Sequence, residues 1–482
     1  MILLTLRIIE KILIIYFTLY FLVDILMYFY SLGVFFFHRY KKIPDLDYAS
    51  HPISIVVPSY NEEVSIITCT DMLSELDYPD FEVIVVNDGS TDHTMQVLED
   101  YYDLTPRNFI PENQIQTSHV KNIYDVKGKN VVIIDKENGG KADAVNTGIN
   151  YSKGKYICTI DADSVLDMTS LKAVIEPFIR QPETIVSGGQ LAVANDVQIE
   201  NNRIISSHVP KNIWVQWQIL EYIKSFLISR MAFSKINALL IMSGAFSVFK
   251  KADLTAVGGF LSKQNRHPYI ENQLGKGLQT VCEDMEIVVR LWQYKRDLKQ
   301  KAKAQFVPEA VCWTEVPESS TNLFKQRSRW HQGLGETLKI HRKMLFEPHY
   351  GTTGLLGLPY YLFFEFLSPV IKIFSLIFVI VAAYYGILNL RWVILLLLSI
   401  MLTTAFIMSS ITLVIEYWSQ KNEMANRDAL RYKTFADWIW LLISGILSEF
   451  TYSFFKIAAQ INGILAFMKK KHEWNKFERK GI

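Results

Sequence analysis

Two aspartates separated by one residue stand directly behind an apolar run in the middle of the chain. Asp161 and Asp163 follow "YICTI", which has the β-branched and aromatic composition of a buried strand. Hard divalent cations prefer carboxylate oxygens, and a nucleotide diphosphate needs such a cation. A solvated pair of loop carboxylates has the same spacing, but the position behind a strand favours a site for Mg²⁺ or Mn²⁺ and a diphosphate.

Two further polar positions could contact a nucleotide. Asp88 in "VVNDGS" could accept hydrogen bonds from a base or ribose beside a sharp turn at Gly89, or it could cap a helix, as Ser90 also could. Lys141 follows two glycines where a helix is expected to start, and backbone N–H groups there favour anions. An ordinary surface lysine is the alternative.

Two motifs further along the chain could hold an acceptor. In "CEDMEIVVRLW", Glu283 and Asp284 fall in the first turn of a helix, where the helix dipole alone favours acids. A sugar hydroxyl that attacks an anomeric carbon also needs a general base, and Asp284 is our candidate. The small residues of "SGAF", beginning at Ser243 and Gly244, leave room for a substrate or serve packing only.

The stretch "QRSRW" places Gln326, Arg329 and Trp330 at positions i, i+3 and i+4, on one face of a helix. Sugars stack on tryptophan, and arginine can grip a departing phosphate with two hydrogen bonds. An amphipathic helix with arginine and tryptophan at the lipid headgroups has the same pattern. The spacing leaves both interpretations open.

The elements that must position these residues alternate from residue 53 onward. Strands are expected at 53–60, 81–88, 130–136 and 156–163, with helices over 62–76 and from near 91 and 140. This order predicts a parallel sheet covered on both faces, with ligands beyond the carboxyl ends of the strands. No GxGxxG or P-loop motif is present. The polar stretch 100–129 is expected to be a surface insertion.

Apolar blocks flank this region on both sides. Residues 12–37, 358–388, 392–418 and 435–468 are candidate membrane segments. Glu365 and Pro369 interrupt the second block, and Glu449 and Lys456 interrupt the last, which we expect to be bent or partly interfacial. The basic segment "HRYKK" after the first block predicts a cytoplasmic middle region. A further crossing would put the basic tail outside, against the same rule.

The bulk composition excludes some functions. A net charge of +2 gives no reason to expect nucleic acid or acidic partners. The four cysteines form no CxxC motif, so zinc is not expected, and their wide separation fits a reducing cytosol. We expect a membrane anchor over 1–42, a catalytic domain over 43–318, acceptor and interface helices over 319–357, and a membrane region over 358–482.

Seven motifs occur here in the order of a known family: "VVPSYNEE", "VNDGSTD", "NGGKADAVNTGI", "DADS", "SGAF", "CED" and "QRSRW". The set resembles the family 2 glycosyltransferases, in the polysaccharide-synthase branch that holds cellulose, chitin and hyaluronan synthases. "WTEVPES" is most similar to the poly-β-1,6-N-acetylglucosamine synthase subgroup. The resemblance implies an α/β GT-A domain, with a mostly parallel Rossmann-like sheet, inserted between N- and C-terminal transmembrane helices.

The resemblance also implies roles for individual residues. Tyr60, Glu62 and Asp88 would hold uridine, with Lys141 beside the nucleotide. Asp161 and Asp163 would serve the diphosphate and its Mg²⁺ or Mn²⁺. Asp284 would be the general base, while Ser243 and Gly244 would line the acceptor. The acceptor end and the leaving diphosphate would be held by Gln326, Arg329 and Trp330.

The chain departs from the family pattern in places. Cys282 stands where several relatives have threonine, and no gating loop of the cellulose-synthase type is evident. "RDALR" has the spacing of a cyclic-di-GMP motif without the rest of that module, so we interpret it as loop basicity.

The expected function is processive, inverting transfer from a UDP-sugar, with UDP-N-acetylglucosamine the preferred donor. The product would be an extracellular β-linked polysaccharide of the biofilm type, secreted through the plasma membrane. The expected partners are the donor, the growing polysaccharide, membrane lipid and a small accessory membrane subunit. The alternatives are addition of one sugar to a lipid acceptor, and a non-catalytic subunit that binds a nucleotide sugar.

Overall fold

The computed structural model describes residues 2–37, 45–109, 111, 115–200, 203–423, 431–432 and 434–469. The segment "HRYKK", most of the basic loop 419–433 and the tail 470–482, on which the predicted orientation depends, lie outside the described residues.

A ten-stranded mixed sheet forms the centre of the soluble region, in the order β3-β4-β5-β2-β1-β6-β11-β8-β12-β7. Its strands are β1 Ile53–Ser59, β2 Phe81–Asp88, β3 Leu104–Pro106, β4 Val120–Val126, β5 Val131–Lys136, β6 Tyr156–Thr159, β7 Ser164–Leu166, β8 Thr184–Val193, β11 Ser247–Lys250 and β12 Lys303–Thr314. A separate hairpin is formed by β9 Val197–Glu200 and β10 Arg203–Ser207.

The four predicted strands are present as β1, β2, β5 and β6, and they pair in parallel. Successive side chains of β1 pack into different cores on the two faces, Val56 into one and Ile55 into the other. Burial on both faces explains why these strands are almost continuously apolar. Since parallel strands end at the same edge, the polar loops behind them meet there. β11 then joins antiparallel to both β6 and β8.

Helices cover both faces of the sheet. One face carries α2 Ile66–Ser74, α3 Thr94–Tyr101 and α5 Ser170–Arg180. The other carries α4 Lys141–Tyr151, α6 Ile213–Ile223 and α10 Glu283–Asp297. The remaining helices of this region are η1 Lys224–Arg230, which is a π-helix, α7 Met231–Lys235, α8 Lys251–Ala256, α9 Pro268–Gln273 and α11 Ser320–Ile340.

The stretch 100–129 is more than the expected surface insertion, because it includes β3 and β4. β4 extends the sheet antiparallel to β5, and β3 pairs antiparallel with β4 at the edge. Charged and polar side chains such as Lys121, Asn122 and Asp125 give β4 the composition of a loop. Such residues are common near sheet edges, where they discourage pairing with other chains, and they concealed the strand from the sequence pattern.

Two helices are long and apolar enough to cross a membrane, over Leu3–Phe37 and Leu390–Gln420. The first, α1 Ile2–Phe37, begins earlier than the predicted segment. Two further helix pairs pass the same test together but are bent, by 47° between Thr353–Phe366 and Ser368–Tyr384 and by 51° between Phe435–Phe450 and Tyr452–Lys469. The second bend falls between Glu449 and Lys456, as expected.

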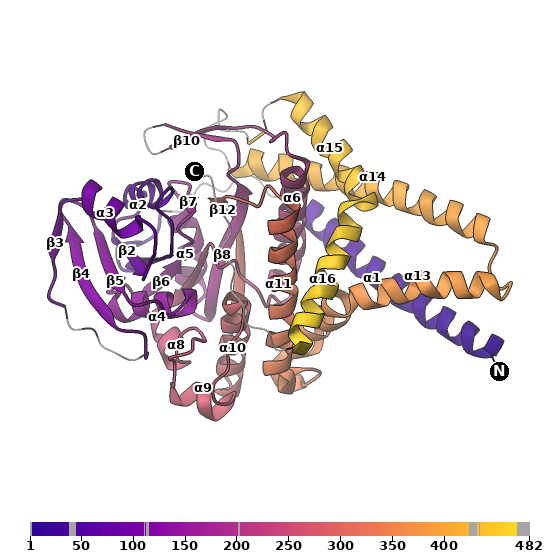
Figure 1. The fold of residues 1–482 in the computed structure, drawn as a ribbon, viewed down its shortest axis with the longest axis horizontal. Helices are drawn as coiled ribbons and strands as arrows, with labels where there is room; N and C mark the ends of the chain where they lie inside the picture. The colour runs from indigo at the N-terminus through magenta and orange to yellow at the C-terminus, as the bar shows by residue number, and fades with distance from the viewer. Residues whose placement is uncertain are drawn as a thin grey trace.

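The elements of the C-terminal region are η2 Arg342–Met344, η3 Pro348–Tyr350, η4 Thr353–Gly357, α12 Leu358–Tyr360, η5 Tyr361–Phe366, α13 Ser368–Tyr384, α14 Leu390–Glu423, α15 Phe435–Phe450 and α16 Tyr452–Lys469. Figure 1 shows the sheet at one end of the molecule and α1, α13 and α14 projecting from the other. Between them run α6, α11 and α16, and α11 packs closely along α16. The helix with "QRSRW" therefore connects the soluble region to the C-terminal apolar helices.

Candidate active site

The loops behind β1 and β2 are fastened to each other. Asn61 has a positive φ of 56°, and its side-chain oxygen accepts a hydrogen bond from the Thr91 N–H at 2.7 Å. The Ser90 hydroxyl accepts from the Asn61 N–H at 2.9 Å. Tyr60 is half-buried here, and Glu62 is buried and accepts from the Ser65 hydroxyl at 3.2 Å. Tyr60 and Glu62, two of the three residues predicted to hold uridine, thus lie on a loop held by side-chain hydrogen bonds.

Asp88 lies at the centre of a buried network rather than open to solvent. Its carboxylate accepts from Lys136 at 2.5 Å and from the N–H groups of Gly139 at 3.0 Å and Gly140 at 2.7 Å. Lys136 also pairs with Asp143 at 2.7 Å, and neither of these two side chains is exposed. Asp88 therefore shapes the glycine turn before α4, and its contact with uridine stays a prediction.

Glycine is required at the turn after Asp88. Gly89 has a φ of +64°, and a Cβ there would come within 2.7 Å of the backbone nitrogen of Asn138. The sharp turn expected at this position is present, and it lets the loops behind β2 and β5 approach closely.

Lys141 joins the aspartates behind β6 to the first turn of α10. Its Nζ lies 2.5 Å from Asp161 Oδ1 and 3.9 Å from Glu283 Oε1. Burial disfavours its charge, but Asp161, Glu283 and Asp284 outweigh burial and raise the pKa of Lys141. The surface-lysine alternative is therefore wrong, because this lysine lies inside an acidic cluster.

Asp163 is buried, while the Asp161 side chain is 26% exposed. Among the described residues, no three or more His, Cys, Asp or Glu side chains gather as a metal site. Two carboxylates still suit a hard cation that takes its other oxygen ligands from a diphosphate. These aspartates fit a cation that arrives with its nucleotide better than a cation held by protein alone.

The turn containing Ser243 and Gly244 holds Asp284. The Gly244 N–H donates to Asp284 Oδ2 at 3.2 Å, and the Ser243 hydroxyl accepts from the Ala245 N–H at 3.2 Å. A Cβ on Gly244 would lie only 3.3 Å from Lys141 Nζ and 3.4 Å from Asp284 Oδ2. The small residue makes room for these two side chains, and an acceptor contact here stays a prediction.

The carboxyl group of Glu283 lies in the same cluster and has a raised pKa. Burial, together with the adjacent Asp284, raises the pKa of Glu283, although Lys141 favours its charged form. Two neighbouring acids with one lysine beside them form the kind of environment in which a proton can be taken up.

The helix α11 confirms the helical spacing expected for "QRSRW". Trp330 is 37% exposed, and Gln326 accepts a hydrogen bond from Arg327. Arg329 lies within electrostatic range of Glu283. Of the three residues predicted to hold an acceptor, Arg329 is thus the one linked to the acids of α10.

Sequence reasoning missed the residues that attach α11 to the turn before α10. Glu336 accepts from the Val281 N–H at 2.9 Å and from Gln332 at 2.9 Å. Gly333 packs so closely on Cys282 that a Cβ would overlap it. Only Gly333 and Glu336, within two turns beyond "QRSRW", could have signalled this contact.

Arg327 was also missed, although it stands inside the motif. Its guanidinium donates to Glu221 at 3.0 and 2.6 Å and lies 4.1 Å from the centre of the Trp330 ring. Glu221 in turn accepts from Tyr452 at 2.7 Å and Lys456 at 3.2 Å of α16. Burial opposes ionisation, but Arg327 and Lys456 outweigh it and lower the pKa of Glu221 to about 2.

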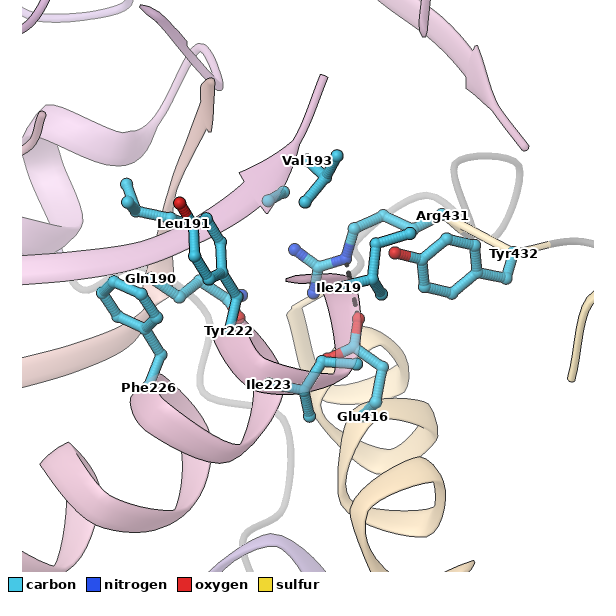
Figure 2. A pocket seen from close by; sticks show the side chains of 11 residues that line it. Gln190, Leu191, Val193, Ile219, Tyr222, Ile223, Phe226, Glu416, Arg431 and Tyr432 are labelled. Atoms are coloured by element: carbon cyan, nitrogen blue, oxygen red, sulfur yellow. Dashed lines mark ion pairs between the residues drawn. The ribbon is translucent and has the colours of Figure 1, made fainter. Parts of the chain in front are cut away.

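A small pocket lies elsewhere, between β8, α6 and α14 (Figure 2). Glu416 and Arg431 form an ion pair at 3.1 Å in its wall. None of the predicted site residues lines this pocket, so we do not assign it to the nucleotide.

Comparison with known proteins agrees with this geometry. The profile of Glycosyl transferase family 2 matches residues 54–254, and that of Glycosyl transferase family group 2 matches residues 156–419. Poly-β-1,6-N-acetyl-D-glucosamine synthase of Staphylococcus epidermidis is 28% identical over 59% of this chain and 55% of the relative. The Staphylococcus aureus enzyme is 27% identical over 62% of this chain and 58% of the relative.

These matches span little more than half of the length of the curated relatives. Among solved structures, the mannosyltransferase PcManGT from Pyrobaculum calidifontis, in complex with GDP-Man and Mn²⁺, aligns with a TM-score of 0.56 and 19% identity. The alignment covers 96% of this chain and 99% of that one, and it confirms the expected GT-A fold with apolar helices at both ends. The chain belongs to glycosyltransferase family 2.

Proposed function

We propose that this glycosyltransferase is a membrane-embedded processive synthase that polymerises a UDP-sugar with inversion, UDP-N-acetylglucosamine being the preferred donor. The observation that carries the proposal is the position of α11. One helix places Arg329 within electrostatic range of Glu283, contacts Cys282 through the carbonyls of Arg329 and Trp330, and packs along the apolar helix α16. Acceptor binding and the route into the membrane would then share one element.

In the proposed reaction, Asp284 takes the proton of an acceptor hydroxyl as that oxygen attacks the anomeric carbon of the donor. The bond from this carbon to the diphosphate breaks, and UDP leaves with the bonding electrons. Lys141 and Arg329 would stabilise the charge that develops on the diphosphate. A bound Mg²⁺ or Mn²⁺, held by Asp161 and Asp163, would neutralise the diphosphate further.

Polar side chains on the apolar helices support a secretion path. Asp24 of α1 pairs with Lys224 of η1 at 3.2 Å, and Glu365 of η5 accepts from Tyr360 at 3.3 Å. Lys456 of α16 reaches Glu221 of α6. Charges at membrane depth are costly and usually face protein or water, so these residues suit a path for a hydrated polymer.

The same arrangement is the basis for our proposed location and organisation. A multi-pass protein of the plasma membrane, with its catalytic domain in the cytoplasm, would meet UDP-sugars where they are made. We propose that the chain consists of a membrane anchor (1–42), a catalytic domain (43–318), acceptor and interface helices (319–357) and a membrane region (358–482). A small accessory membrane subunit is a further proposed partner.

The test is UDP release by the detergent-purified full chain over a panel of UDP-sugars with Mg²⁺ or Mn²⁺, with the product sized. One donor that gives a long polymer, lost in Asp284→Asn, would establish the synthase. Addition of a single sugar would favour a lipid acceptor instead. If no donor gives UDP release, even after a candidate subunit is added, the result would contradict an active enzyme and favour a binding subunit.

A further inference from the structure

A buried arginine, Arg230, lies within electrostatic range of Asp284 and has no hydrogen-bond partner for two of its donor atoms. Nε and Nη1 of Arg230 are buried and find no hydrogen-bond acceptor within the described part of the chain. The whole side chain is only 9% exposed. Buried donors are nearly always satisfied in folded proteins, and each exception calls for an explanation.

The surroundings of Arg230 are aromatic rather than acidic. Its guanidinium carbon lies 3.7 Å from the centre of the Phe226 ring. Tyr361, Asp284 and Tyr222 lie within electrostatic range, and burial lowers the pKa of Arg230 to about 10. The side chain is therefore still positively charged at neutral pH, yet none of the ion pairs found among the described residues includes it.

The backbone also marks this position. Arg230 is the last residue of η1, a seven-residue π-helix, and π-helical turns occur frequently at functional sites. Its first residue, Lys224, pairs with Asp24 of α1. One short helix thus carries a cation towards the apolar helices at its start and another near the proposed base at its end.

We propose that Arg230 binds oxygen atoms of the sugar at the acceptor end of the growing polysaccharide and so holds that sugar beside Asp284. The inference rests on the proposed function, because it takes Asp284 as the base. An arginine among aromatic rings suits a neutral sugar, whose hydroxyl or amide oxygens accept its N–H groups while its apolar face contacts the rings.

A lipid phosphate is the less suitable ligand at this position. A phosphate bound to Arg230 would lie near the Asp284 carboxylate, and two like charges in a poorly hydrated site repel each other. The groups that perturb the pKa of Arg230 are Tyr361, Asp284 and Tyr222, and none of these three is a cation. A neutral acceptor carries no such repulsion.

The experiment measures acceptor binding directly. A short oligomer of N-acetylglucosamine is titrated into the full-length detergent-purified protein with UDP and Mg²⁺, using wild type, Arg230→Met and Arg230→Lys. Arg342→Met is the matched control, because Arg342 is exposed on η2. UDP binding to each variant shows that the donor side is folded, and UDP release is assayed separately.

Arg230→Met is expected to weaken oligomer binding by about tenfold or more, as for a lost hydrogen bond to a charged group. Arg230→Lys should regain part of the loss, and UDP binding and Arg342→Met should match wild type. Unchanged oligomer binding in Arg230→Met would overturn the inference, as would a loss confined to a polyprenyl phosphate probe.

The two proposals fail in different ways. If wild type binds the oligomer in an Arg230-dependent manner but releases no UDP from any donor, the proposed synthase function is wrong and the proposed role of Arg230 in binding stands. If UDP release and polymer length are the same in wild type and in Arg230→Met, the synthase stands and the role of Arg230 is wrong. If Arg230→Met does not fold, Arg230→Lys decides, because it keeps the charge and removes the Nε and Nη1 donors. Oligomer binding weaker than in wild type, with UDP binding unchanged, then supports the inference. Oligomer binding equal to wild type overturns it.

Discussion

The two sides of the candidate site differ in how completely the protein satisfies the hydrogen bonds of its charged side chains. On the side that would bind the sugar donor, Asn61, Asp88 and Lys136 tie together the loops behind β1, β2 and β5. Their polar side-chain atoms find hydrogen-bond or ion-pair partners within the protein. On the acceptor side, Arg230 and Arg329 each carry buried N–H groups without a partner among the described residues, and Trp330 is partly exposed.

This difference suggests a division of labour. A nucleotide has a fixed shape, so loops that are organised before it binds lose little freedom when it arrives. A polymer that must advance after every transfer cannot be met by groups that are satisfied permanently elsewhere. The incomplete hydrogen bonding of η1 and α11 is what we expect of a surface whose ligand moves.

The largest expected effect is on the chemical step rather than on binding at either side of the site. Asp284→Asn keeps the size of the side chain but removes the base, so turnover should fall about 10³-fold. UDP release measures the rate, and binding of UDP should be unchanged because Lys141 and Asp161 are intact. Turnover near the wild-type rate would transfer the role of base to another group, Glu283 first.

Lys136→Met tests whether the donor side is held together as described. Asp88 and Asp143 would both lose their buried counter-charge, and breaking such a pair typically costs about 3–5 kcal/mol. The midpoint of thermal unfolding should therefore fall strongly. Lys127→Met is the control, since Lys127 and Asp103 pair at an exposed site and should contribute nothing measurable.

On the acceptor side, His331 of α11 should make stability depend on pH. Burial lowers its pKa from 6.5 to about 4. The unfolded chain then binds the proton first, so stability is complete above pH 6.5, falls as the pH drops towards 4 and is constant below that. The full loss is about 3 kcal/mol.

Thermal unfolding of wild type and His331→Gln between these pH values measures this contribution. The variant should lose most of the slope, while His349→Gln, at a more exposed histidine, should retain it. Equal slopes in all three proteins would show that His331 is not the group that titrates.

The smallest expected effect concerns the contact between α11 and the turn before α10. Gly333→Ala would push a methyl group into Cys282 and displace Asp284 from Arg329 and Trp330. Because small displacements of reacting groups are costly, we expect about a tenfold loss of turnover with little change in UDP binding. Gly33→Ala in α1, where a Cβ meets nothing within 4 Å, should be neutral.

Periodicity predicted the strands that matter most, since β1, β2, β5 and β6 are short apolar runs buried on both faces. It failed at β4, whose Lys121 and Asp125 suit a sheet edge. It also predicted that Gln326, Arg329 and Trp330 share a helix. It could not predict that Glu336 holds that helix to Val281 and that Gly333 packs on Cys282, because the contacts join segments about 50 residues apart in sequence.

The family, the polar loops behind the strands and the apolar ends of the chain could all be inferred from the sequence, because each depends on neighbouring residues and their spacing. Tertiary structure alone decided which charges are satisfied. Asp88 binds the glycine turn, Lys141 lies between two acids, and Nε and Nη1 of Arg230 are left without a described hydrogen-bond partner. These outcomes depend on contacts between distant segments and on burial, which change the energy of a charge far more than its local sequence does.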